Sequence, residues 1–172
     1  AIYDHQLYVL AIGEDPTPRA YRLSRISAVR PRTKAFSYPG RSEYDPEVLF
    51  RDTFGIFVRA ERPVEDVVLR LTPRWLTYAR SHRWHASQHV AEDGAGRVIV
   101  RMRVRICNEF EAFVLGFGAE AEVLEPPGLR ASIAAHVRAL HERYRDVLPP
   151  LDQAAVPAGD GDARAGNGAG RS

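Results

Sequence analysis

Cysteine and long apolar runs are nearly absent from this chain, and both absences exclude classes of protein. The 172 residues contain one cysteine, Cys107, which excludes a disulfide within the chain and favours a reducing compartment. No apolar run approaches the roughly 20 residues that a membrane-spanning helix needs, and no signal peptide is visible. The sequence therefore predicts a cytoplasmic protein with no membrane segment.

Methionine is equally scarce. The only one is Met102 and the chain opens with Ala1, so we expect a fragment or a processed product. The remaining composition is ordinary for a globular protein, with 45% hydrophobic and 27% charged residues. A chain of this length fits one good-sized domain or two small ones.

Acidic residues are missing from one window of the sequence. Between Pro16 and Arg41 there are seven basic residues and no acidic ones, although the net charge of the whole chain is only +2. Such a window is typical of an anion-binding surface. An arginine-rich composition is the alternative explanation, but it accounts for the arginines and not for the missing acids.

Motifs that specify a reaction are absent as well. The sequence has no nucleophile elbow, no P-loop and no paired-cysteine motif. His82, His85 and His89 have spacings that would suit zinc on a single helix. However, the chain is expected to leave the helix between Trp84 and Gln88, which would scatter the three rings. The sequence predicts no enzyme, no metal and no cofactor.

The first forty residues have strand patterns. Two strands are predicted around a Pro-rich turn, at residues 6–12 and 19–29, and residues 33–38 are a candidate third strand. In the second strand, Arg19 and Arg25 are expected to point one way and Arg22 the other. Three strands do not close a barrel, so residues 1–40 are expected to form an incomplete domain.

A connector with a short helix is predicted for residues 41–62. Asp45 is a good N-cap, Pro46 fits the first turn, and Gly55 is a good stop. The helix is expected to pack against one or both neighbouring domains through an apolar stripe of Leu49, Phe50, Thr53 and Phe54.

Residues 63–148 have the most regular pattern in the chain. Apolar residues alternate from Val98 to Ile106 after a hairpin turn at Asp93–Gly96, and an earlier strand alternates through Val67, Leu69 and Leu71. Helices are predicted from Pro73 to His82, from a cap at Asn108 to Gly118, and after Pro127. The order is β-α-β-β-α-β plus a helix, which predicts an α+β, ferredoxin-like domain. Residues 149–172 are rich in Ala, Gly and Asp, and a disordered tail is expected.

Several of these segments together resemble a known family. "LYVLAIG…PRAYRLSRI" resembles the body of a WYL domain, with Leu7-Tyr8-Val9 at the position of the name-giving Trp-Tyr-Leu, and "DPEVLFRDTFGIF" resembles the connector after it. The stretches "VVLRLTPRWLTYARSHRWHASQ" and "VLGFGAEAEVLEPPGLRASIAAHVRALHERY" are similar to WCX, the C-terminal extension of WYL-type regulators. The resemblance covers residues 2–148.

This resemblance implies a bacterial transcriptional regulator in which a helix-turn-helix binds DNA. It also implies a small Sm/SH3-like barrel that senses a nucleic-acid or nucleotide-like ligand, and an extension that contributes to a homodimer. The chain departs from the family twice. The helix-turn-helix and the first part of the barrel are absent from it, and Leu7 replaces the name-giving aromatic residue.

The leading candidate ligand site follows from the resemblance. In the family the arginines of "R-x-Y-R-L-x-R-I" meet an anionic ligand, and here they correspond to Arg19, Arg22 and Arg25, with Tyr8 on the preceding strand. Guanidinium groups suit phosphate because they bind it with two parallel hydrogen bonds and also stack on bases. The alternative is that one arginine forms a salt bridge with a neighbouring domain.

A second basic stripe is predicted on the outer face of the last hairpin, at Arg101, Arg103 and Arg105. It could hold an acidic partner or a nucleic-acid backbone. The alternatives are pairing with acids on neighbouring strands and plain solvation. We therefore expect the effector-sensing and dimerisation portion of a regulator, with single-stranded nucleic acid or a nucleotide as its effector. The rival hypothesis is a purely structural dimerisation module.

Overall fold

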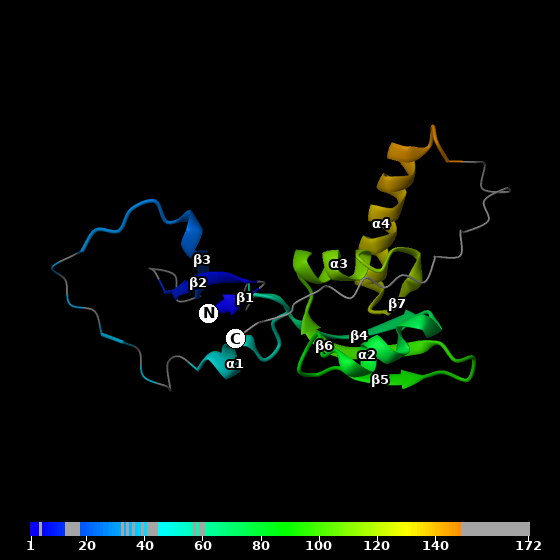
Figure 1. The fold of residues 1–172 in the computed structure, drawn as a ribbon, viewed down its shortest axis with the longest axis horizontal. Coiled ribbons are helices and arrows are strands. Elements are labelled where there is room, and N and C mark those ends of the chain that lie inside the picture. Colours follow the sequence, from blue (N-terminus) through cyan, green and yellow to red (C-terminus); the bar gives the residue numbers. More distant parts are fainter. Residues whose placement is uncertain are drawn as a thin grey trace, which may run out of the picture. The chain divides into compact units, whose positions relative to one another are not determined.

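A computed structural model of the chain describes residues 1–3, 5–12, 18–31, 33, 35, 37–38, 40, 45–56, 58 and 61–148. The described residues form a mixed α+β structure with two antiparallel sheets (Figure 1). The chain divides into two compact units, residues 1–136 and residues from 137 on. The expected disordered tail, residues 149–172, lies outside the described residues.

The first sheet has three short strands in the order β1-β2-β3. They are β1 (Ile2–Tyr3), β2 (Gln6–Ala11) and β3 (Arg19–Arg22), and the described strands do not close a barrel. Exposure alternates along β2 and β3, so each strand has one half-buried and one exposed side, and no residue of the three strands is fully buried.

The second predicted strand is shorter than expected. It ends at Arg22 instead of residue 29, and a single turn of 3₁₀-helix (Leu23–Arg25) follows, closed by the amide of Ile26 on the carbonyl of Leu23 at 3.1 Å. Leu23 and Ile26 are both exposed, so a longer strand would gain little from burial. The candidate third strand at 33–38 is wrong for its described residues, Thr33, Ala35, Ser37 and Tyr38, which are not in a strand.

The connector helix α1 (Pro46–Phe50) begins as predicted. The Asp45 side chain accepts a hydrogen bond from the amide of Glu47 at 2.9 Å, which satisfies one of the free amides of the first turn. The chain then continues into the second sheet region. Thr53 forms a parallel β-bridge with Arg105, and Phe54 and Ile56 are buried.

The second sheet has four strands in the order β5-β6-β4-β7, and all neighbours are antiparallel. The strands are β4 (Val64–Leu71), β5 (His89–Glu92), β6 (Val98–Arg105) and β7 (Ala121–Glu125). The helix α2 (Leu76–Ser81), preceded by a 3₁₀ turn (Pro73–Trp75), lies between β4 and β5 in sequence, and α3 (Asn108–Leu115) lies between β6 and β7. The predicted order of elements is therefore present.

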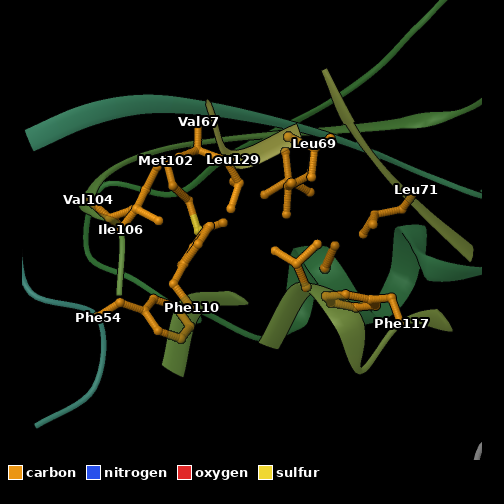
Figure 2. Close-up of a cluster of buried hydrophobic side chains, with 14 of the residues drawn as sticks. Phe54, Val67, Leu69, Leu71, Met102, Val104, Ile106, Phe110, Phe117 and Leu129 are labelled. Carbon is orange, nitrogen blue, oxygen red and sulfur yellow. The ribbon is translucent and has the colours of Figure 1, made fainter. Parts of the chain in front are cut away.

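One face of this sheet carries the core. The residues predicted to point inward, including Val67, Leu69, Val100 and Val104, are buried, and α2 and α3 contribute Ala79, Phe110 and Val114 to the same cluster. Figure 2 shows Phe54 of the connector beside Phe110 of α3; the two ring centroids are 4.9 Å apart and the rings are nearly perpendicular. A segment outside the sheet thus completes its core.

Two helix boundaries differ from expectation. Cys107, not Asn108, is the N-cap of α3, and its side chain makes no capping hydrogen bond. The helix ends at Leu115, and Gly118, at φ +58°, begins a 3₁₀ turn (Gly118–Glu120). Both differences are shifts of one to three residues, the range in which sequence signals for helix ends overlap.

The last helix, α4 (Pro127–Tyr144), begins after Pro126 as predicted, but its apolar face is only partly covered. Leu129 is buried and Ile133 packs against the core, whereas Val137, Leu140 and Tyr144 are about half exposed, at 54%, 50% and 57%. The predicted stripe exists, and its second half lies on the surface of the described chain. No described helix is long and apolar enough to cross a membrane.

Candidate functional site

Tyr8 and Arg22 are direct neighbours on the half-buried side of the first sheet. They are paired in register across β2 and β3, and Nε of Arg22 donates a hydrogen bond to Oε1 of Gln6 at 3.2 Å. Leu10 and Ala20, the next pair on this side, are also half-buried. The hydrogen bond to Gln6 holds the Arg22 side chain along the sheet.

Arg19 lies on the opposite side of the same strand. It pairs in register with Ala11, and its side of the sheet also carries the exposed Leu7, Val9 and Tyr21. The alternation predicted for Arg19 and Arg22 is therefore present. Since three residues of strand span about 10 Å, these two arginines differ in both face and position.

Arg25 lies beyond the strand, in the last residue of the 3₁₀ turn, and is exposed. The turn breaks the alternation that was expected to bring Arg25 to the face of Arg19. The structure thus pairs Tyr8 with Arg22 on one face of the sheet, places Arg19 on the other face, and places Arg25 beyond the end of the strand. The four residues do not form one pocket on one face of the sheet.

Arg19 and Arg22 both lie on a strand at the edge of the sheet. β3 pairs with β2 on one side only, so its other side is an edge within the described residues. A ligand that lies along an edge strand can meet side chains from both faces and the backbone N–H groups between them. Within the described residues, Arg19 and Arg22 therefore lie on opposite faces of one edge strand.

The three arginines of the stripe predicted on β6 differ in their interactions. Arg105 donates from Nε to the carbonyl of Arg62 at 3.2 Å, and its guanidinium lies 3.7 Å from the carboxylate of Asp52. Arg101 and Arg103 are exposed, and within the described part of the chain their guanidinium groups make no hydrogen bond or ion pair. Arg103 is paired in register with Asp66.

Charges on the neighbouring strands are largely neutralised. Arg70 on β4 forms an ion pair with Glu122 on β7, and Arg130 joins it at 2.9 Å. Hydrogen bonds from Arg70 and then Arg130 hold the pKa of Glu122 below its usual value. Within the described part of the chain, Arg101 and Arg103 are therefore unpaired, whereas Arg70, Arg105 and Arg130 are paired with acids.

The three histidines do not form a metal site. His82 stacks on Tyr78 at the end of α2, His89 begins β5, and His85 lies buried in the loop between them. No group of three potential ligands was found among the described residues. The predicted scattering of the rings between helix and strand is confirmed.

Sequence reasoning missed the junction between the connector and β6. The amide of Arg105 donates to the carbonyl of Asp52 at 2.8 Å, and His85 faces the same segment. The signal in the sequence is the apolar stripe through Thr53 and Phe54, which predicts packing against one or both neighbouring domains but not against which strand.

Comparison with known proteins supports the resemblance for the second sheet region. Residues 63–141 match the family model of the WCX domain. Proteasome accessory factor B/C (PafBC) of Arthrobacter aurescens is a similar solved structure, with 22% identity over 82% of this chain and a TM-score of 0.39. The match covers 21% of that protein, so this chain spans about a fifth of its length. No curated protein matches the chain. Residues 63–141 are thus similar to the WCX domain, the C-terminal extension of WYL-type proteins, and this match covers less than half of the chain.

Proposed function

We propose that the chain is the effector-sensing and dimerisation portion of a bacterial WYL-type transcriptional regulator. The WCX match supports this reading for residues 63–141. In this proposal residues 1–40 are part of an Sm/SH3-like barrel, 41–62 connect it to the extension, and 63–148 form a ferredoxin-like domain. The strand order β5-β6-β4-β7, with helices after β4 and β6, is the order expected of that plan.

The ligand in this proposal is single-stranded nucleic acid or a nucleotide, bound along the edge of β3. The observation that carries it is the window between Pro16 and Arg41, with seven basic residues and no acid. Arg19 and Arg25 supply the phosphate contacts because both are exposed, while Tyr8 and Arg22 shape the adjoining side. The protein acts in the cytoplasm without catalysis, and the complete regulator reaches DNA through a separate domain.

The second candidate function is a structural dimerisation module without a ligand. It is favoured by α4, where Val137, Leu140 and Tyr144 present a half-exposed apolar row on one helix. In this case the arginines of β3 would pair with acids of a partner chain. The two candidates differ in their response to salt, because phosphate contacts weaken steeply with added salt and apolar burial does not.

The test is fluorescence anisotropy of a labelled single-stranded oligonucleotide across a salt series. Each phosphate-binding arginine contributes about 0.7 to the slope of log affinity against log salt for a single strand. The double variant Arg19→Ala, Arg25→Ala should therefore lower that slope by about 1.4 units, because two phosphate contacts are lost. Lysine replacements should restore part of the affinity, since a point charge cannot make the bidentate contact.

The matched control is Arg101→Ala, Arg103→Ala, which removes the same charge from the other sheet. It should leave the slope unchanged. Equal slopes for the wild type and the Arg19, Arg25 variant would contradict the ligand site and favour the dimerisation module. A slope that falls equally in both double variants would mean that binding follows net charge alone.

A further inference from the structure

The second half of α4 carries a row of apolar side chains on its surface. This α4 row consists of Val137, Leu140, Tyr144 and Val147, which are 54%, 50%, 57% and 72% exposed. The amides of Val147 and Leu148 donate to the carbonyl of Tyr144 at 3.1 and 3.0 Å, so the chain keeps turning past the end of the helix. At 1.5 Å per residue the row is about 15 Å long. A continuous apolar row of this kind marks an interaction surface, whereas single exposed apolar residues do not.

The α4 row begins where the contacts of the helix with α3 end. The hydroxyl of Ser132 donates to Oε1 of Glu111 at 2.9 Å, and Nε2 of His136 lies 3.5 Å from Oε2 of the same carboxylate. Every residue from 134 to 148 is exposed. The second compact unit also begins at Val137, the first residue of the row. The α4 row is therefore not part of the core of the four-stranded domain.

The spacing of the row is that of a coiled-coil seam. From Ile133 to Val147 the apolar residues follow one another at intervals of four, three, four and three. This pattern places them at the a and d positions of a heptad, where they form a narrow stripe that one neighbouring helix can cover. Helices that lie on a membrane surface carry a broader apolar face. The seam therefore favours a helix as its occupant.

The charged residues beside the α4 row are basic. With about 100° between successive residues of a helix, His141 lies along one side of the row and Arg143 along the other. Within the described part of the chain, neither side chain makes a hydrogen bond or an ion pair. The acids of this stretch, Glu142 and Asp146, lie on the opposite side of the helix, and Glu142 is held by Arg145 at 2.6 Å. An apolar stripe with positive margins is complementary to one with negative margins.

A second copy of α4 does not supply negative margins. In an antiparallel pair of helices, margins of the same kind meet, so the margin with Arg143 would face itself. In a parallel pair, unlike margins meet, which brings His136 of one copy opposite His141 of the other. In neither orientation does an acid of one helix face Arg143 or His141 of the other, because the acids lie away from the seam. Charge complementarity therefore favours a different protein.

We propose that the α4 row is the docking site for a partner protein that presents an amphipathic helix with acidic margins. The partner helix packs its apolar stripe on Leu140 and Tyr144 and places carboxylates beside His141 and Arg143. The proposal goes beyond the function proposed above, because it does not depend on the ligand site at β3 or on dimerisation through another surface. It assigns the α4 row to a different occupant from that of the dimerisation module, and the experiment below distinguishes the two.

Two designed peptides test the site on the intact chain. Each has about three heptads with Val at a and Leu at d, and one carries Glu and the other Lys at every e and g position. Repulsion between identical margins disfavours pairing of either peptide with itself. Fluorescence anisotropy of the labelled peptides should show binding of the Glu peptide. The Lys peptide should bind about tenfold more weakly or not at all, because like charges then face each other.

Two substitutions with the same change of charge separate docking from net charge. Arg143→Glu, at the margin, should weaken the Glu peptide by about tenfold and strengthen the Lys peptide. Arg138→Glu, exposed on the same helix but away from the row, should leave both affinities within about twofold. Leu140→Asp should abolish binding of the Glu peptide. Because Leu140 is half exposed, this variant should keep the melting curve of the wild type.

Other results would overturn the proposal. Equal affinity for the two peptides, or no binding of the Glu peptide, would mean that the α4 row does not receive an acidic helix. Self-association of the chain in sedimentation velocity, if Leu140→Asp removes it, would assign the row to a second copy. Binding to vesicles of phosphatidylserine and phosphatidylcholine, if the same variant removes it, would assign the row to a membrane surface.

Discussion

The two sheets of this chain bury very different amounts of side chain. Every second residue from Val98 to Val104 is buried to 2% exposure or less, whereas no residue of β1, β2 or β3 is fully buried. Both sheets are antiparallel and both alternate. The difference shows that alternation gives a strand two faces, and that packed helices and a connector are needed to make one of those faces a core.

The largest expected effect comes from breaking the well-packed sheet. Val100→Asp places an unpaired carboxylate at a fully buried position of β6, and such a group costs several kcal/mol. We expect the four-stranded domain to unfold, as measured by circular dichroism and thermal melting. Arg101→Asp, one residue further on the exposed face, should shift stability by about 0.5 kcal/mol or less. An unchanged melting curve for Val100→Asp would contradict the assignment of faces.

The variant Phe54→Ala tests whether the connector contributes to the stability of the four-stranded sheet. Phe54 is 9% exposed and contacts Phe110 and Phe113. Truncation of a buried phenylalanine costs about 3–5 kcal/mol, and we expect the lower end because the site is at the rim of the core. Urea unfolding followed by tryptophan fluorescence gives the value. Phe50→Ala, at a half-buried position on α1, is the control and should cost less than half as much.

The smallest effect is expected in the three-stranded sheet. Leu10→Ala removes a half-buried side chain from β2, and the loss should be about 1 kcal/mol within that sheet. Both tryptophans, Trp75 and Trp84, lie in the four-stranded region, so their fluorescence reports that region alone. Its midpoint should not move in Leu10→Ala. A shifted midpoint would mean that the two sheets unfold together.

Much of the second sheet could be predicted because its signals are local. The alternation from Val98 to Val104, the Asp93–Gly96 turn and the proline before α4 each depend on a few adjacent residues. The length of the second strand could not be predicted. A strand continues to pair only where further pairing buries more apolar surface, and the sequence alone does not show which side chains will be buried. The junction of Thr53 with Arg105 joins residues far apart in the sequence, and no periodic pattern encodes such a contact.

The candidate site could likewise be predicted only where it depends on a few adjacent residues. The alternation of Arg19 and Arg22 across β3 follows from the strand itself and is present. The position of Arg25 depends on the 3₁₀ turn, which breaks the period of two. The burial of His85 could not be predicted, because this residue lies in a loop with no periodic pattern.

The β-bridge between Thr53 and Arg105 bears on how such modules can be exchanged between proteins. A chimaera joined at residue 63, where the family match begins, would contain β6 and α3 but not two groups that contact them. These groups are the Phe54 ring, which packs on α3, and the Asp52 carbonyl, which accepts a hydrogen bond from the amide of Arg105. The recipient would have to supply both from an unrelated linker. A junction placed before Asp45 moves the cap, the short helix and the bridge with the domain they complete, so a transferable unit should begin at least 18 residues before the family match, which starts at residue 63.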